Sequence, residues 1–150
     1  MKKKKGVSPI IATVLLIAMV IVIGLIIFLW FRGMVEESVT KFGKNVELVC
    51  ADVEFDSTYS DSTLSISNTG NVPLFGMKIE ISEGGNYETK SIRELSDSWP
   101  INGLGPGDSF SESIDFGSAD KITSIPVLLG TSEKGDKSFV CDGYGKEEKI

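Results

Sequence analysis

The pattern of apolar and polar residues divides the chain into two parts with different periods. From Val7 to Phe31 there are 25 consecutive residues without a charge, mostly Ile, Val and Leu. About 20 helical residues cross the roughly 30 Å hydrocarbon core of a bilayer, so the 22 residues from Ile10 to Phe31 predict a membrane-spanning helix. The alternative, a buried helix of a soluble protein, would be expected to have a polar face or to be shorter.

The residues that flank this segment indicate where the helix begins and how far it continues. Ser8 is a suitable N-cap, and Pro9 suits the first helical position, where its missing N–H costs nothing. A helical i, i+4, i+7 stripe continues beyond the span through Val35, Val39 and Phe42. The sequence therefore predicts a hydrophobic helix and stalk over residues 7–43, helical from Pro9 to Phe42.

After Gly43 the period changes to two, which is typical of strands with one buried and one solvated face. Alternating runs occur at residues 49–56, 63–67, 75–82 and 110–116. Residues 122–129 are nearly all apolar and predict a strand covered on both faces and interrupted by Pro126, and residues 139–141 predict the last strand. Turn residues lie between these runs, at 68–71, 83–86, 105–108 and 133–136. Residues 44–150 are therefore predicted to form an antiparallel β-sandwich.

Charge is segregated as sharply as hydrophobicity. The 150 residues have a formal charge of −6, yet their mean hydropathy is +0.10. Four lysines, Lys2 to Lys5, precede the apolar segment, whereas Glu36 and Glu37 follow it, so the positive-inside rule predicts a cytoplasmic N-terminus and an external C-terminal domain. Residues 33–150 hold ten Lys and Arg against all 21 Asp and Glu. So acidic a domain repels phosphates, which argues against nucleic acid as a partner.

The chain lacks the residue types on which most catalytic and metal sites depend. It has no His, so a Ser-His-acid triad is impossible, and its two Cys cannot complete a zinc site. Residues 103–107 lack the Lys-Ser/Thr of a phosphate loop. Two acidic groups could bind Ca²⁺ but lack EF-hand spacing, so a solvated acidic face is the preferred interpretation: Asp52, Glu54 and Asp56 with Asp61, and Asp115 with Asp120. We expect no catalytic residue, no metal and no cofactor, and we expect that the protein is not an enzyme.

Trp99 has two interpretations of equal weight. It is an exposed aromatic residue for recognition, or a loop residue folded onto the core. The neighbouring Asp97 and Pro100 do not decide between them.

The two cysteines lie at opposite ends of the predicted β domain. Outside a cell a disulfide between Cys50 and Cys141 is expected to persist. Closing a loop of about 90 residues stabilises a domain by roughly 4–5 kcal/mol in the chain-entropy model. Two unpaired buried thiols are the alternative. Cys50 falls on the polar phase of its alternating run, which indicates a bridge on an outer face or at a strand edge.

The N-terminal segment from Lys4 to Ile17, KKGVSPIIATVLLI, resembles the start of archaeal type IV pilins, and the resemblance covers residues 2 to about 34. In that family a prepilin-type peptidase cleaves on the cytoplasmic side of the apolar segment, after a charged residue followed by Gly. The resemblance places this recognition and cleavage site at Lys5, Gly6 and Val7, with cleavage before Val7. Bacterial type IV pilins usually have Glu five residues into the mature chain, whereas this chain has Ile11, which disfavours a bacterial-type pilin.

The resemblance implies an organisation in three parts: a cleaved basic leader (residues 1–6), the helix and stalk (7–43) and an extracellular β-sandwich (44–150). It implies a structural subunit of a surface filament for adhesion or surface contact. Its partners would be other copies of itself through the helix, the prepilin peptidase, the pilus assembly machinery and the membrane. The precursor would lie in the cell membrane and the assembled filament outside the cell. The alternative is an uncleaved signal-anchored membrane protein whose sandwich binds a cell-envelope partner, similar to archaellum stator proteins.

The amino-acid sequences of residues 64–71, 75–81 and 104–108 are similar to those of immunoglobulin-like adhesion-type modules. The predicted fold class is therefore α+β: a long N-terminal hydrophobic helix, transmembrane or in a filament core, followed by an all-β antiparallel, immunoglobulin-like sandwich.

Overall fold

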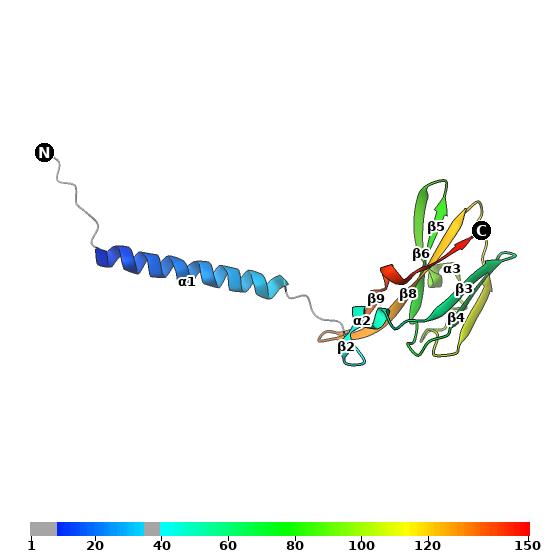
Figure 1. Cartoon of the computed structure of the whole chain (residues 1–150), viewed down its shortest axis with the longest axis horizontal. Coiled ribbons are helices and arrows are strands. Elements are labelled where there is room, and N and C mark those ends of the chain that lie inside the picture. Colours follow the sequence, from blue (N-terminus) through cyan, green and yellow to red (C-terminus); the bar gives the residue numbers. More distant parts are fainter. Residues whose placement is uncertain (1–8, 35–39) are drawn as a thin grey trace. The chain divides into compact units, whose positions relative to one another are not determined.

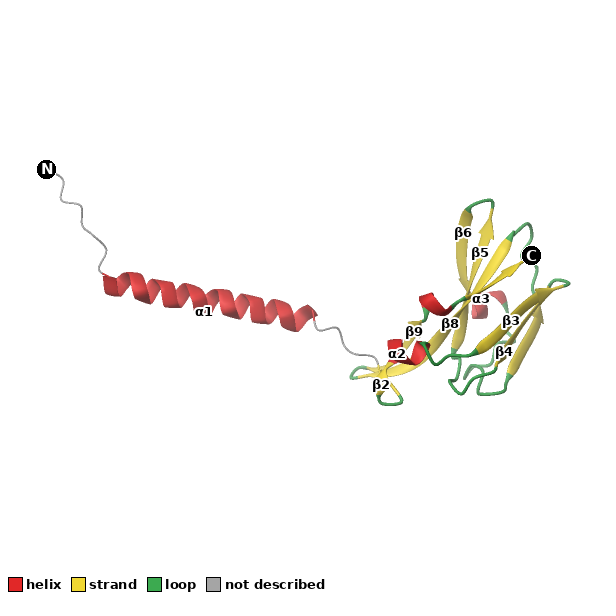
Figure 2. Ribbon diagram, in the orientation of Figure 1, coloured by secondary structure: helices red, strands yellow, loops and turns green. Residues whose placement is uncertain are grey.

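The computed structural model describes residues 9–34 and 40–150 (Figure 1). The chain separates into two compact units, Met1–Ser38 and Val39–Ile150. The described part of the first unit is one helix, and the second unit contains all the strands and the other, short helices (Figure 2). The α+β class, with one apolar N-terminal helix followed by antiparallel sheets, is thus confirmed.

Helix α1 (Pro9–Met34) has 26 residues. Every residue from 9 to 31 is exposed, and apolar side chains cover all its faces. The 23 residues Pro9–Phe31 are long and apolar enough to cross a bilayer, since they extend about 35 Å at 1.5 Å per residue. A helix that packs on a soluble core would have a polar side, so the sequence of α1 is suited to lipid or to other apolar helices.

The predicted helical extension to Phe42 is wrong at its end. Thr40–Lys41 form strand β1 and Lys44–Asn45 form strand β2, while Val35 and Val39 lie outside the described residues. Phe42 (φ 55°) and Gly43 (φ 74°) make the two-residue turn that joins these strands. Two successive residues with positive φ match the twist of a hairpin and cannot continue a helix.

The strands form two antiparallel sheets. The smaller sheet has the order β3–β4–β7, with bounds β3 (Phe55–Ser60), β4 (Thr63–Asn68) and β7 (Ser109–Ser113). The larger sheet has seven strands around β8 (Lys121–Ser132). Besides β1 and β2, its other members are β5 (Gly76–Glu83), β6 (Asn86–Ser91), β9 (Gly135–Val140) and β10 (Lys146–Lys149).

Strand β8 organises the larger sheet because it pairs with four others. On one side it pairs with β5 and then, at Thr131, with β1; on the other side it pairs with β10 and then with β9. Pro126 lies where β10 has ended and β9 has not begun, and its carbonyl oxygen accepts a hydrogen bond from Cys141 N at 2.9 Å. The missing N–H of Pro126 therefore falls in a gap of the ladder, and the prediction that Pro126 interrupts the strand is wrong.

One hydrophobic core receives side chains from both sheets. Its most deeply buried members include Leu64, Ile66, Ile79, Ile122 and Leu128. Each fully buried Leu or Ile contributes about 1.5–3 kcal/mol. Inside this core the hydroxyls of Ser57 (β3) and Ser124 (β8) are hydrogen-bonded at 2.8 Å, which joins the two sheets directly.

The predicted strand over residues 49–56 is wrong in its first half, where the chain forms helix α2 (Val46–Cys50). The Asn45 side chain accepts a hydrogen bond from Glu47 N and caps this helix. Val46, Val49 and Cys50 are buried at i, i+3 and i+4, a spacing that belongs to one helical face and that a strand cannot bury.

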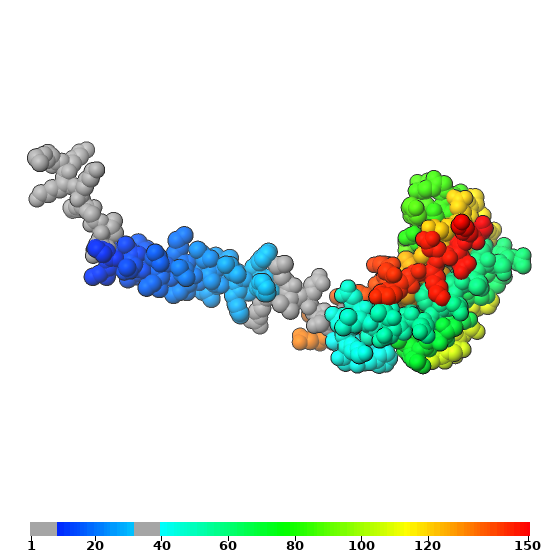
Figure 3. Space-filling model, in the orientation of Figure 1, coloured from blue at the N-terminus to red at the C-terminus, as the bar shows by residue number. Residues whose placement is uncertain are grey.

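The C-terminal segment closes the domain. After β9 come the 3₁₀ helix η1 (Asp142–Tyr144) and β10, which lie on the domain surface (orange to red in Figure 3). Lys146 pairs with Asp56 of β3 at 2.8 Å, and Lys121 pairs with Glu147 at 2.9 Å. The hydrogen bond that Lys121 donates to the Glu147 carboxylate raises the pKa of Lys121 above its ordinary value of 10.5.

Candidate functional site

Two features of the described residues are candidates for function: the apolar surface of α1 and the region around the disulfide. On α1, large apolar side chains from Ile10 to Phe31 are 45–74% exposed. Trp30 and Phe31, at 66% and 64%, lie near the C-terminal end of the helix, where aromatic side chains suit a membrane–water interface. Outside the backbone of its own helix, no described atom lies within 4 Å of a Cβ added at Gly24.

The predicted peptidase site, Lys5, Gly6 and Val7, lies outside the described residues. Recognition and cleavage there stay predictions. The chemistry of the site depends on the sequence resemblance alone.

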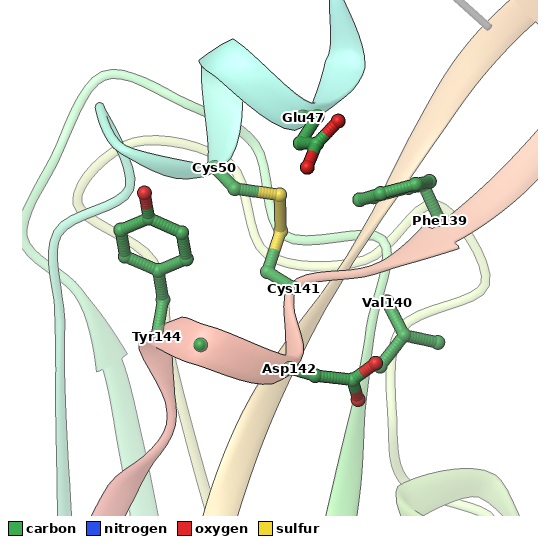
Figure 4. Close-up of a pocket in the computed structure, with 8 residues that line it drawn as sticks. Glu47, Cys50, Phe139, Val140, Cys141, Asp142 and Tyr144 are labelled. Carbon is green, nitrogen blue, oxygen red and sulfur yellow. A yellow bond between two sulfur atoms is a disulfide. The ribbon is translucent and has the colours of Figure 1, made fainter.

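The structure joins Cys50 and Cys141 in a disulfide (Figure 4). Their Cα atoms are 5.6 Å apart and their sequence separation is 91. Cys50 ends α2, and Cys141 is the residue between β9 and η1. The two side chains are only 1% and 2% exposed, so the expectation of a bridge on an outer face is wrong. The bond attaches the start of the domain to its last segment.

A hollow of about 280 Å³ lies beside the disulfide. Its lining comes from α2, β9 and η1 and includes Glu47, Phe139, Asp142 and Tyr144 (Figure 4). The charged groups of this lining are the carboxylates of Glu47 and Asp142. The disulfide-bonded Cys50 and Cys141 are part of the same lining.

Two of the acidic residues considered for Ca²⁺ accept hydrogen bonds from backbone N–H groups of glycines. Asp115 Oδ1 accepts a hydrogen bond from Gly117 N, and Asp120 Oδ2 accepts one from Gly84 N, both at 2.8 Å. Within residues 9–34 and 40–150, no group of three or more His, Cys, Asp or Glu is placed to hold a metal ion.

Trp99 is folded onto the core, which decides between its two interpretations. It is 5% exposed, and its ring lies 5.1 Å from that of Phe110, centroid to centroid. Its Nε1 donates a hydrogen bond to the carbonyl oxygen of Phe75 at 3.1 Å. Trp99 is therefore a packing residue.

The sequence interpretation missed the hairpin formed by β1 and β2. Lys41 Nζ donates a hydrogen bond to Leu129 O at 2.8 Å and lies 5.3 Å from the centroid of the Phe42 ring. Burial lowers the pKa of Lys41 below its ordinary value of 10.5. Phe42 itself is 69% exposed. Gly43 was the available signal for a turn, but the apolar stripe that precedes it favoured a helix.

Comparison with known protein families finds no family model that matches this chain. The curated proteins likewise include no match. The fold and the site define a class of architecture. An apolar N-terminal helix is followed by a β domain of two sheets with an internal disulfide.

Proposed function

We propose that this protein is a pilin, a structural subunit of an archaeal type IV pilus-like surface filament. The observation that carries the proposal is the surface of α1, which is apolar on all sides over a length sufficient to cross a bilayer. As a precursor, the helix is surrounded by lipid. After extraction the same surface must be buried, and copies of the same helix provide an apolar environment at about 1.5–3 kcal/mol for each buried Leu, Ile or Val.

The β domain is the part displayed outside the cell. Residues 40–150 hold ten Lys and Arg against 19 Asp and Glu, and such an acidic surface keeps a domain soluble while the helices assemble. We assign it to the immunoglobulin-like sandwiches because two antiparallel sheets share one core. Its disulfide joins α2 to the end of β9, unlike the bridge between sheets of antibody domains. Adhesion or surface contact is its proposed task.

The leader directs the precursor. Lys2 to Lys5 hold the N-terminus in the cytoplasm, and the prepilin peptidase cuts between Gly6 and Val7. The pilus assembly machinery then takes up the processed subunit. Removal of the four lysines makes the mature chain more acidic, from −6 to −10.

The intact mass of the protein from the cell surface of an archaeal host tests this proposal. We expect a chain that begins at Val7. A Gly6→Phe variant should keep its leader and form no filaments, because the bulky side chain blocks the peptidase. Gly24→Leu is the control: it adds a bulky apolar residue within α1, where nothing lies within 4 Å, and it should be processed normally.

A surface chain that begins at Met1 or Lys2 would contradict the pilin proposal. It would instead support the uncleaved signal-anchored protein whose β domain binds a partner in the cell envelope. Normal filament yield from Gly6→Phe would also count against cleavage as a step in assembly.

A further inference from the structure

The β1–β2 hairpin exposes an aromatic residue at a costly backbone position. Phe42 has φ 55°, and its side chain is 69% exposed. Gly or Asn is the usual residue at such a turn position, and a bulky residue with positive φ is uncommon. Burial in the core does not explain this residue, because its side chain is mostly exposed and only borders an open hollow that Ala51, Asp52, Glu54, Asn71 and Val72 also line. An exposed aromatic ring at the tip of a hairpin is suited to contact a surface outside the domain.

The hairpin also differs in charge from the rest of the domain. Residues 40–46 contain Lys41 and Lys44 and no acid, whereas residues 47–150 contain eight Lys and Arg against 19 Asp and Glu. Lys41 is held by its hydrogen bond to Leu129 O and lies near the ring of Phe42, while Lys44 is exposed. The hairpin therefore combines positive charge with an apolar ring, and it complements a negatively charged surface that has an apolar interior.

The hairpin is the first part of the chain after α1 that the structure describes. Five residues, 35–39, separate Met34 from Thr40, so the two Cα atoms are joined by a chain that extends at most about 22 Å. The headgroup layer on each side of a bilayer is about 5–7 Å thick. A helix that spans the membrane thus keeps this hairpin within chain reach of the lipid surface.

We propose that the β1–β2 hairpin docks onto the headgroup layer of anionic phospholipids while the subunit is still in the membrane. The Phe42 ring lies in the interface, and the ammonium group of the exposed Lys44 faces lipid phosphates. This docking rests on the membrane span of the proposed function, but it is independent of cleavage and assembly. It holds the domain at the membrane until the helix is extracted.

Photo-crosslinking of the full chain in vesicles tests this contact. Phe42→p-benzoylphenylalanine keeps an aromatic ring at the turn, and the chain is reconstituted in vesicles of phosphatidylglycerol and phosphatidylcholine. The matched control is Tyr87→p-benzoylphenylalanine, since Tyr87 is 65% exposed and pairs with Ser82 at the Lys121 end of β8. That end is about 30 Å along β8 from Thr131, where β1 pairs. Figure 3 shows the β1–β2 segment (cyan) and the β5–β6 turn (light green) at different ends of the domain.

We expect a phospholipid adduct by mass spectrometry at position 42 and none at position 87. Lys44→Gln in the position-42 variant should lower the adduct yield about fivefold, which corresponds to about 1 kcal/mol for one basic residue near an anionic membrane. Lys149→Gln removes an exposed lysine of β10, which pairs with Lys121 at the far end of β8, and it should leave the yield unchanged.

Vesicle-bound protein that gives no lipid adduct at position 42, or that crosslinks there to a second copy of the chain, would overturn the docking proposal and leave the membrane span intact. Protein released from the vesicles by alkaline extraction would overturn both the span and the docking. Unchanged circular dichroism and thermal unfolding of the variants would show that the domain is still folded.

Discussion

Asn68 shows how much one buried polar side chain does in this domain. It is 1% exposed. Its Nδ2 donates hydrogen bonds to Val72 O at 2.9 Å and Leu104 O at 3.1 Å, and its Oδ1 accepts one from Gly70 N at 3.1 Å. A single amide thus joins the end of β4 to two separate loops.

We predict that Asn68→Ala lowers the free energy of unfolding by about 2–4 kcal/mol. Val72 O and Gly70 N–H lose the Asn68 side chain as partner, and Leu104 O loses one of its two hydrogen bonds. Chemical denaturation of the two proteins measures the difference. Asn71→Ala, an exposed asparagine three residues away, should change stability by less than about 0.5 kcal/mol. Equal effects of the two substitutions would contradict the role of Asn68.

At the level of elements, the loop between α3 (Ile92–Leu95) and β7 is where glycine is required for two different reasons. Gly103 has φ +79°, and a Cβ added there would lie 2.0 Å from Leu74 O. The close approach comes from the bridge in which Leu74 and Leu104 exchange backbone hydrogen bonds of 2.9 and 2.8 Å. Gly107 has a similar φ, +81°, but nothing within 4 Å.

These two glycines form a matched pair of substitutions. Gly107→Ala should cost about 1–2 kcal/mol, the cost of a left-handed backbone for an L-residue. Gly103→Ala should cost at least about 2 kcal/mol more, since a backbone bridge must open as well. Chemical denaturation gives the unfolding free energy of both variants. If Gly103→Ala is as stable as Gly107→Ala, the loop can move away from the added Cβ at little cost.

Elements with strict alternation were predictable, and polar or very short ones were not. Leu64 and Ile66 in β4, Met77 and Ile79 in β5, and Phe110 in β7 are buried as the period of two requires. Strands β6 and β10 are almost entirely polar, so they carry no such signal and are formed through their backbone pairing with β5 and β8. Helix α2 has only five residues, too few for a helical period to be distinguished from an alternating one.

For the whole domain, the Cys50–Cys141 disulfide is the longest covalent constraint. It closes a loop that contains seven of the ten described strands, β3 to β9. The double variant Cys50→Ala/Cys141→Ala should lose about 4–5 kcal/mol by the chain-entropy model, with a further loss where the buried side chains leave space. Thermal unfolding with and without reductant gives a second measure: the wild type should lose stability on reduction and the double variant should not respond. If the wild type is equally stable with and without reductant, the disulfide does not stabilise the domain.

The sequence by itself determined the division of the chain into an apolar helix and an acidic β domain, because hydrophobic period and charge are local properties. It likewise indicated the strands with one buried face and most of the turns. Only the tertiary structure decided that Pro126 continues β8, that Trp99 packs on Phe110, that Phe42 stands at the tip of a hairpin and that the disulfide is buried. The outcomes for Pro126, Trp99 and the disulfide depend on partners elsewhere in the sequence, such as Cys141 for Pro126. The hairpin at Phe42 pairs locally, Thr40 with Asn45, and only its place beside Thr131 of β8 depends on a distant residue. Local periodicity contains no information about such pairs, since they exist only after the two sheets have closed over a common core.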